Sequence, residues 1–293
     1  MIKIASGHSH PASSTVALVN LCNQLNSRGY GGVLYGPDNW HIGKCPSGLL
    51  RDFKPEAGDI IILHDIDLRS VSELNDLNSV LFGKERKNLL HGLGRVISSR
   101  FSPSSSPDKF KLFLTCQDEN AGCGMAIRHS LFNKIHFVSA AQKGFNTKCR
   151  KFVCPNFLAD LTPSEGKPEK TAGIIGSISR KNDTQTIIEK ALQDGMETVI
   201  LYGYLADPIY YYAAIAPLAK LHRGKIKYAG FVENQQKMYD SISDAYAASS
   251  SPWSMVRREC AMTHTRFHGS EAQADTNIPN EQIFEIWKRE LEL

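Results

Sequence analysis

Ala172-Gly173-Ile174-Ile175-Gly176-Ser177-Ile178-Ser179-Arg180-Lys181 is the stretch that best indicates the fold of this 293-residue chain. Its first four residues are small or apolar and predict a short buried strand. The Gly/Ser turn that follows leads into a helix whose apolar residues are Ile187, Ile188, Ala191 and Leu192. A strand, a tight turn and a helix in this order are typical of a doubly wound α/β sheet.

The same unit recurs on both sides of this stretch. Downstream, the residue pattern predicts strands at 198–202, 225–229 and 245–248, and helices at 235–242, 253–262 and 280–291. Upstream, it predicts a helix after Ser13 and strands at 2–5, 32–35, 59–64, 87–91, 110–115, 135–139 and 153–157. Residues 160–170 are polar and contain prolines, as a linker does.

We therefore predict an α/β protein of two Rossmann-like domains, residues 1–160 and 171–293, with a cleft between them. The length suits two domains of roughly 100–150 residues each. The last helix, 280–291, is amphipathic through Ile283, Ile286, Trp287 and Leu291, and we expect that it can pack back on the first domain.

Composition limits the classes of protein that remain. No run of 18 apolar residues occurs, and the start of the chain lacks the apolar core of a signal peptide, so we expect a cytoplasmic location. Seven cysteines without a C-x-x-C pair predict reduced, mostly buried thiols. The net charge of +4 is compatible with an anionic substrate but too small to indicate DNA binding by itself. The basic stretch 143–151 keeps a nucleic-acid acceptor open.

The second half of the chain, most of residues 172–268, resembles the GT-B glycosyltransferases, and among them the family-4-like retaining group. In that family a glycine turn after the first strand carries cations that hold the donor diphosphate at a helix N-terminus. The resemblance places this turn at Gly176-Ser177-Ile178-Ser179-Arg180-Lys181. Lys181 matches the family lysine. Ser177 stands where the family has arginine, and Arg180 is the candidate to replace it.

A second motif of the family is a serine-rich strand end followed by a helix with Glu-x7-Glu. Residues 246–261 match it without a gap, with Glu259 at the second position, which in the family binds the donor ribose. Ser251 occupies the first position, where the family has glutamate that grips the donor sugar. Two further strand ends, Tyr202-Gly203 and residues 228–232 with Phe231, are similar to those that approach the nucleobase.

The first half resembles the family more weakly. The loop Gly7-His8-Ser9-His10-Pro11 occupies the place near the diphosphate, although the family's Gly-Gly pair is absent. His91-Gly92 looks like the family's strand-end His-Gly, where the histidine lies near the donor sugar. His64-Asp65 ends another strand and is the competing candidate, with Asp65 as a general base if the enzyme inverts configuration. Asp65-x-Asp67 also resembles a metal-binding pair of another glycosyltransferase fold, but we expect no metal here.

These features predict a hexosyltransferase that moves sugar from a nucleoside-diphosphate sugar, such as a UDP-sugar, to an acceptor hydroxyl without cofactor or metal. A nucleotide-sugar epimerase or hydrolase of the same fold remains an alternative, and so does a non-catalytic nucleotide- or sugar-binding protein. The acceptor stays open between a glycan, a lipid, a small molecule and a modified DNA base, as does peripheral contact with a membrane. We expect Trp253 and the tyrosines Tyr210, Tyr211 and Tyr212 to be packing residues.

Overall fold

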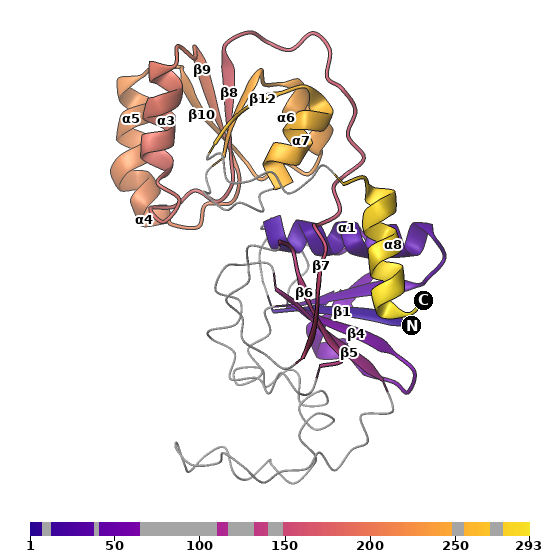
Figure 1. Cartoon of the computed structure of the whole chain (residues 1–293). Helices are drawn as coiled ribbons and strands as arrows, with labels where there is room; N and C mark the ends of the chain where they lie inside the picture. Colours follow the sequence, from indigo (N-terminus) through magenta and orange to yellow (C-terminus); the bar gives the residue numbers. More distant parts are fainter. Residues whose placement is uncertain are drawn as a thin grey trace, which may run out of the picture. The chain divides into compact units, whose positions relative to one another are not determined.

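A computed structural model describes residues 1–7, 13–37, 41–64, 110–116, 132–139, 149–247, 255–269 and 278–293. The chain divides into two compact units (Figure 1). Unit 1 comprises Met1–Ser9, Leu21–Pro155 and Ile283–Leu293, and unit 2 comprises His10–Asn20 and Asn156–Gln282. None of the described helices combines the length and the apolar character that crossing a membrane requires.

Unit 1 is built on a seven-stranded parallel sheet of order β3-β2-β1-β4-β5-β6-β7. Its strands are β1 (Ile2–Ser6), β2 (Gly32–Gly36), β3 (Ser47–Leu49), β4 (Ile60–His64), β5 (Lys111–Cys116), β6 (Lys134–Phe137) and β7 (Arg150–Val153). Helix α1 (Ser13–Ser27) follows β1, and a 3-10 turn, η1 (Leu50–Asp52), follows β3. The central strands are almost wholly buried, because both faces of a parallel sheet are covered.

Helix α8 (Asn280–Leu291) ends the chain, and its residues from Ile283 onward belong to unit 1. Trp287 meets Phe152 of β7 edge to face, with 5.2 Å between ring centroids. The Lys134 ammonium donates to the Glu290 carbonyl at 2.6 Å and lies 3.3 Å from its carboxylate. An apolar face and a buried ion pair therefore fix α8 against β6 and β7.

Unit 2 holds a five-stranded parallel sheet of order β10-β9-β8-β11-β12. Its strands are β8 (Thr171–Ile175), β9 (Thr198–Tyr202), β10 (Ile226–Gly230), β11 (Asp244–Ala247) and β12 (Arg266–His268). Its helices are α3 (Thr184–Gln193), α4 (Pro208–Tyr210), the π-helical turn η6 (Tyr211–Ile215), α5 (Ala216–Leu221), α6 (Gln235–Asp240) and α7 (Met255–Thr263).

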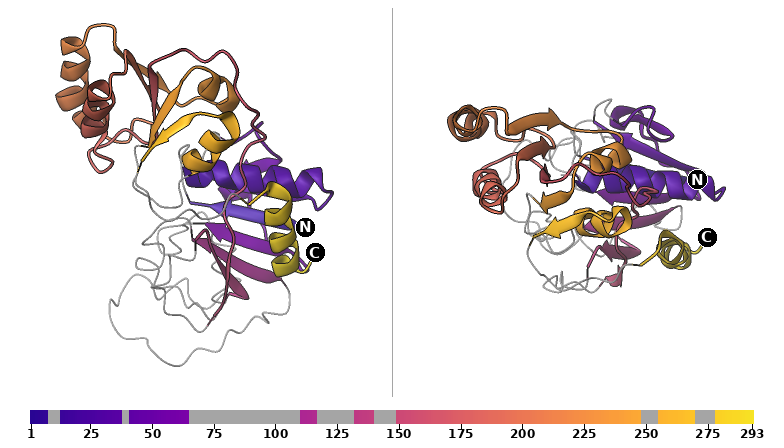
Figure 2. Two further views of the ribbon diagram at one scale, coloured as in Figure 1. Left: turned by 45° about the horizontal axis from the view of Figure 1, so that its top comes forward. Right: turned by 90° about the horizontal axis from the view of Figure 1, so that it is seen from above.

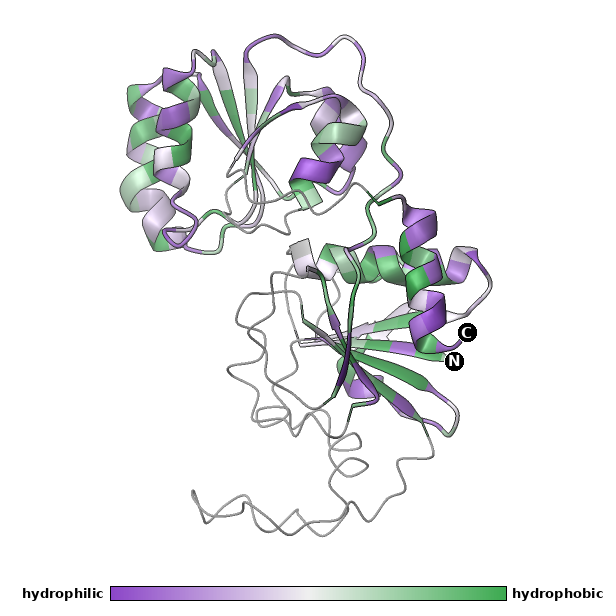
Figure 3. Cartoon of the chain, viewed as in Figure 1, coloured by the Kyte–Doolittle hydropathy of each residue, from purple (hydrophilic) through white to green (hydrophobic). Residues whose placement is uncertain are grey.

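The helices of unit 2 cover its sheet on both sides. Helices α3, α4 and α5 lie on one face, and α6 and α7 lie on the other (Figure 2). The strands are mostly apolar, whereas the helices carry apolar and polar sides (Figure 3). This two-sided covering is the doubly wound arrangement that the sequence predicts, and unit 1 has the same parallel sheet type.

Two sequence-based boundaries differ from the structure by more than two residues, and the helical segment of residues 208–221 and strands β3 and β12 have no counterpart among the predicted elements. Strand β7 is Arg150–Val153, not 153–157, because Pro155 has no N–H to continue the ladder. Residues 160–170, which we expected to link the domains, lie within unit 2. Leu161 is buried there in one cluster with Tyr239, and Gln236 accepts a hydrogen bond from the Thr162 N–H at 2.8 Å. The predicted strand 87–91 lies outside the described residues.

Candidate functional site: the turn after strand β8

The order of strands in unit 2 defines where a ligand should bind. From β8 the chain passes to β9 and β10 on one side, and β11 then lies on the other side of β8. In open α/β sheets, ligands bind at the carboxyl ends of the strands where this reversal occurs. The turn that starts at Gly176 follows β8, so the predicted phosphate turn stands at the reversal point.

Two glycines bring the ends of β8 and β9 together. Gly176 has φ 140° and Gly203 has φ 153°. A Cβ atom on Gly203 would lie only 1.9 Å from the Gly176 carbonyl oxygen. The Gly176 N–H donates to the Tyr202 carbonyl at 2.9 Å, and the Gly203 N–H donates to the Gly230 carbonyl at 2.9 Å. Backbone hydrogen bonds therefore join the ends of β8, β9 and β10 at one edge of the sheet, without intervening side chains.

The turn itself is held by its own hydrogen bonds. Ile178 is fully buried, and its N–H donates to the Tyr204 carbonyl at 2.8 Å. The Asn182 side-chain amide donates to the Ser177 carbonyl at 2.6 Å, and the Asn182 N–H donates to the Ser179 hydroxyl at 3.3 Å. The buried Ile178 and the two hydrogen bonds of Asn182 therefore fix the backbone on both sides of residues 179–181.

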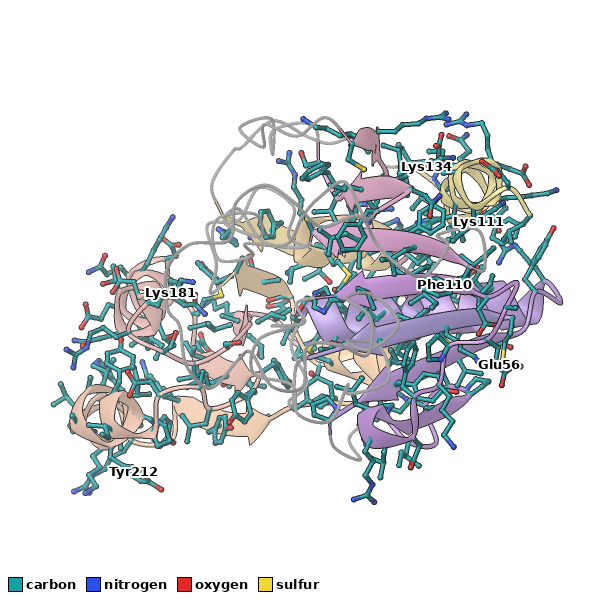
Figure 4. The ribbon with its side chains drawn as sticks, turned by 90° about the horizontal axis from the view of Figure 1, so that it is seen from below. Glu56, Phe110, Lys111, Lys134, Lys181 and Tyr212 are labelled. Carbon is teal, nitrogen blue, oxygen red and sulfur yellow. The ribbon has the colours of Figure 1, made fainter. Side chains whose placement is uncertain are left out.

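Two cations at the tip of this turn have no acidic partner among the described residues: Arg180 and Lys181, both exposed. Figure 4 labels Lys181 beside α3. Within the same described set, the backbone N–H groups of Ser177, Arg180 and Lys181 have no acceptor. Cationic side chains and N–H groups of a glycine turn before a helix are together a favourable environment for an anion such as phosphate.

A tyrosine caps the helix that follows the turn. Asp183, at the N-cap of α3, has φ 48° and makes no side-chain cap hydrogen bond. Instead, the Gln185 N–H donates to the Tyr210 hydroxyl at 2.9 Å. The Arg180 guanidinium also lies 5.8 Å from the centroid of the Tyr210 ring. Tyr210 therefore supports both the helix start and one of the cations, a role that its place in a tyrosine run did not indicate.

Glu259 lies on α7 and is buried, with 2% of its surface exposed. One carboxylate oxygen accepts from the Tyr239 hydroxyl at 2.7 Å, and the other accepts from the Gln235 side-chain amide at 3.3 Å. Burial raises the pKa of Glu259, while the hydrogen bond from Tyr239 opposes the shift. The carboxylate is oriented by α6, and its role toward ribose stays a prediction.

The remaining predicted residues of this half fall into two groups. Phe231, which directly follows β10, is 37% exposed, and Gly203 directly follows β9. The carboxyl ends of these parallel strands share the edge that carries the Gly176 turn. Ser251 and Trp253 lie outside the described residues. Tyr210 is buried and Tyr211 packs against the same core cluster, whereas Tyr212 is 70% exposed and meets the Tyr211 ring edge to face at 5.4 Å between centroids.

In unit 1 the strand order reverses at β1, between β2 and β4. Ser6 and His64, the last residues of β1 and β4, are register partners, and Ser6 Oγ shares a 3.1 Å hydrogen bond with His64 Nδ1. The Gly7 N–H donates to the His64 carbonyl at 3.1 Å. Four predicted site residues of this half lie outside the described residues: His8, His10, Asp65 and His91. The sequence names His64-Asp65 as the candidate that competes with His91, and of this pair the structure describes His64.

Comparison with protein-family models and with curated protein sequences gave no match. Solved structures do resemble the chain. Anabaena HepE in complex with UDP-glucose is similar with a TM-score of 0.61 at 11% identity, over 92% of this chain and 80% of HepE. HepE in complex with UDP and glucose gives a TM-score of 0.63 at 10% identity.

A third similar structure is an α-glucosyltransferase in complex with UDP and a 13-mer DNA containing a central A:G mismatch. The TM-score is 0.53 at 10% identity, over 84% of this chain and 70% of that one. At such low identities the likeness concerns the fold. Together with the two parallel sheets described above, it shows that this chain has the GT-B fold of two Rossmann-like domains.

Proposed function

We propose that the chain is a glycosyltransferase that moves a sugar from a nucleoside-diphosphate sugar, such as a UDP-sugar, to an acceptor hydroxyl. The turn after β8 carries this proposal. It presents Arg180 and Lys181 without an acidic partner in the described structure, beside three N–H groups that have no acceptor there. A diphosphate supplies the negative charge and the oxygen acceptors that this turn lacks. The complexes of HepE and of the α-glucosyltransferase with UDP or UDP-glucose support the same ligand class.

In the proposed reaction, the bond between the sugar C1 and the diphosphate oxygen breaks, and the acceptor oxygen takes its place on C1. Charge grows on the leaving diphosphate as this happens. Lys181, Arg180 and the adjacent N–H groups stabilise that charge because they are fixed before the reaction begins. We propose that these groups make a divalent metal unnecessary.

The other predicted residues have subsidiary roles in this proposal. Glu259 holds the ribose hydroxyls, and Gly203 and Phe231 border the nucleobase. His91 or Asp65 orients or deprotonates the acceptor. The choice between retention and inversion of configuration stays open, as does the acceptor class. We also propose a cytoplasmic location, which the free cysteines of the described residues support, because disulfides are rare in reducing compartments.

Binding measurements test the donor site first. We expect calorimetry to show that UDP binds the wild type and binds the Arg180→Ala/Lys181→Ala double variant at least tenfold more weakly, since two charge-assisted contacts are lost. Lys190→Ala is the matched control, because Lys190 is an exposed cation in the last turn of α3. Equal affinity in the double variant and the wild type would remove the turn from the proposal.

Product analysis then separates the three functions that share such a site. Incubation with a UDP-sugar and a panel of acceptor hydroxyls should yield a glycosylated product and UDP. Free sugar or an epimerised donor in the absence of acceptor would identify a hydrolase or an epimerase. Tight donor binding with no turnover across the panel would identify a binding protein.

A further inference from the structure

An apolar stripe covers the outer side of the helical segment of residues 208–221. This segment comprises α4, the π-helical turn η6 and α5, and its inner side packs on the core through Tyr210, Ile215 and Leu218. Its outer side exposes three large apolar residues, Ile209 at 80%, Tyr212 at 70% and Leu221 at 77%. Figure 4 shows Tyr212 on the outer side of the segment. Ala213 and Pro217, also exposed, complete what we call the outer stripe.

The π-helical turn explains how distant residues share this side. In an uninterrupted α-helix, residues twelve apart, such as Ile209 and Leu221, are turned about 120° from each other. The wider turn over Tyr211–Ile215 rotates the chain less per residue, so Leu221 returns toward the side of Ile209. Such turns inside helices are rare and often accompany function.

Positive charge lies at the end of the outer stripe that carries Leu221, whereas Asp207 caps α4 at the other end. Residues 208–232 contain no aspartate or glutamate. They contain four cations, all exposed: Lys220, Arg223, Lys225 and Lys227. Lys225 interacts electrostatically with Glu197, whereas the other three have no acidic partner among the described residues. Lys220 adjoins Leu221 at the end of α5, and Arg223 follows two residues after Leu221. Lys227 alternates on β10 with Ile226, which packs in the core beneath this segment, so Lys227 points to the other face of the sheet.

We propose that the outer stripe and its flanking cations dock unit 2 on an anionic lipid bilayer. Aliphatic and tyrosine side chains enter the boundary between headgroups and acyl chains, and lysine and arginine pair with the anionic headgroups. A nucleic acid would satisfy the charge, but it would leave Ile209 and Leu221 without a favourable contact, since bases stack on aromatic rings. The proposal does not depend on the donor site, because no stripe residue belongs to the Gly176 turn.

Co-sedimentation with vesicles of two compositions tests the charge requirement. The wild type should bind equimolar phosphatidylglycerol–phosphatidylcholine vesicles and should not bind pure phosphatidylcholine vesicles. Binding should weaken strongly toward 1 M salt, where the Debye length is about 3 Å. Failure to bind the anionic vesicles at low salt would overturn the proposal.

Surface variants with matched controls test whether the outer stripe and its cations are the part of the protein that contacts the vesicle. Ile209→Gln/Leu221→Gln should lower the vesicle partition coefficient on the order of tenfold or more, and Lys220→Glu/Arg223→Glu should lower it at least as much. Ile42→Gln and Lys54→Glu, exposed positions in unit 1, should bind as the wild type does. Thermal unfolding and UDP affinity should be unchanged in all four, which separates docking from folding and from the donor site.

Three results would contradict the assignment. Stripe variants that bind vesicles like the wild type would place the membrane contact elsewhere. A dimer that the Ile209→Gln/Leu221→Gln variant converts to a monomer, with no vesicle binding by either form, would assign the outer stripe to a second copy of the chain. Tight salt-dependent binding of a DNA duplex that only the Lys220→Glu/Arg223→Glu variant loses, again without vesicle binding, would assign the cations to nucleic acid.

Discussion

The hydroxyl of Tyr210 accepts a hydrogen bond from the backbone N–H of Gln185 at 2.9 Å, across 25 residues of sequence. The bond closes the N-terminus of α3, where Asp183 provides no side-chain cap. The ring of the same tyrosine lies below Arg180. One buried side chain thus joins the segment that carries the outer stripe to the turn that carries the proposed diphosphate site.

Replacing Tyr210 by phenylalanine tests this link. Tyr210→Phe keeps the ring beside Arg180 but leaves the Gln185 N–H without its acceptor. We expect a loss of about 1 kcal/mol in the free energy of unfolding, measured by urea denaturation, and a weaker affinity for UDP. Tyr211→Phe is the control, since the Tyr211 hydroxyl makes no hydrogen bond to the described residues. If both variants behave alike, Tyr210 does not position the turn.

Substitution at Gly203 tests the close approach of β8 and β9. An added Cβ would meet the Gly176 carbonyl oxygen at 1.9 Å, which forces the two strand ends apart. We expect Gly203→Ala to lower the free energy of unfolding by at least about 2–3 kcal/mol and to abolish UDP binding. Gly195→Ala is the control, because Gly195 also has positive φ, 87°, but has no atom within 4 Å of the added Cβ. Gly195→Ala should lower the free energy of unfolding by only about 1 kcal/mol.

Much of this arrangement follows from the sequence. Strand β9 and helix α8 have the predicted bounds because an apolar run and a helical apolar stripe each end at clear polar or glycine residues. The GT-B resemblance likewise located the Gly176 turn at the strand reversal. The hydrogen bond from Gln185 to Tyr210 was not predictable, because it joins residues that only the tertiary fold brings together. The helical segment of residues 208–221 was not predicted either, and its π-helical turn, Tyr211–Ile215, differs from an ordinary helix only in its hydrogen-bond spacing.

Protonation of His136 should make unit 1 less stable at low pH. The residue is fully buried between β5 and β7, where Nδ1 shares a 2.8 Å hydrogen bond with Thr115 Oγ1 and Nε2 donates to the Cys154 carbonyl at 2.7 Å. Burial lowers the pKa of His136 to about 4. The unfolded chain, with a histidine pKa near 6.5, binds more protons between these values. The contribution of neutral His136 to the free energy of unfolding is therefore fully present above about pH 6.5. It falls by about 3 kcal/mol as the pH drops to 4.

Urea denaturation between pH 4 and pH 7 measures this pH dependence of the free energy of unfolding. The His136→Phe variant lacks the titrating group and should show a smaller dependence on pH, although it loses two hydrogen bonds and is less stable at pH 7. His222→Phe is the control, because His222 is only half-buried at the end of α5. Identical pH dependence in the wild type and the His136 variant would show that this histidine does not link protons to folding.

Two substitutions at Glu259 distinguish a structural role of this buried carboxylate from a role in binding the donor ribose. Glu259→Ala leaves the Tyr239 hydroxyl, which is buried, without its 2.7 Å acceptor, and should cost about 1–3 kcal/mol of unfolding free energy. Glu259→Gln can still accept from Tyr239 and should fold normally. If the carboxylate also receives the ribose hydroxyls, the wild type should bind UDP more tightly than 2′-deoxy-UDP, and Glu259→Gln should lose most of that preference. A preference that survives in Glu259→Gln, with the fold intact, would restrict Glu259 to orienting α6 and α7.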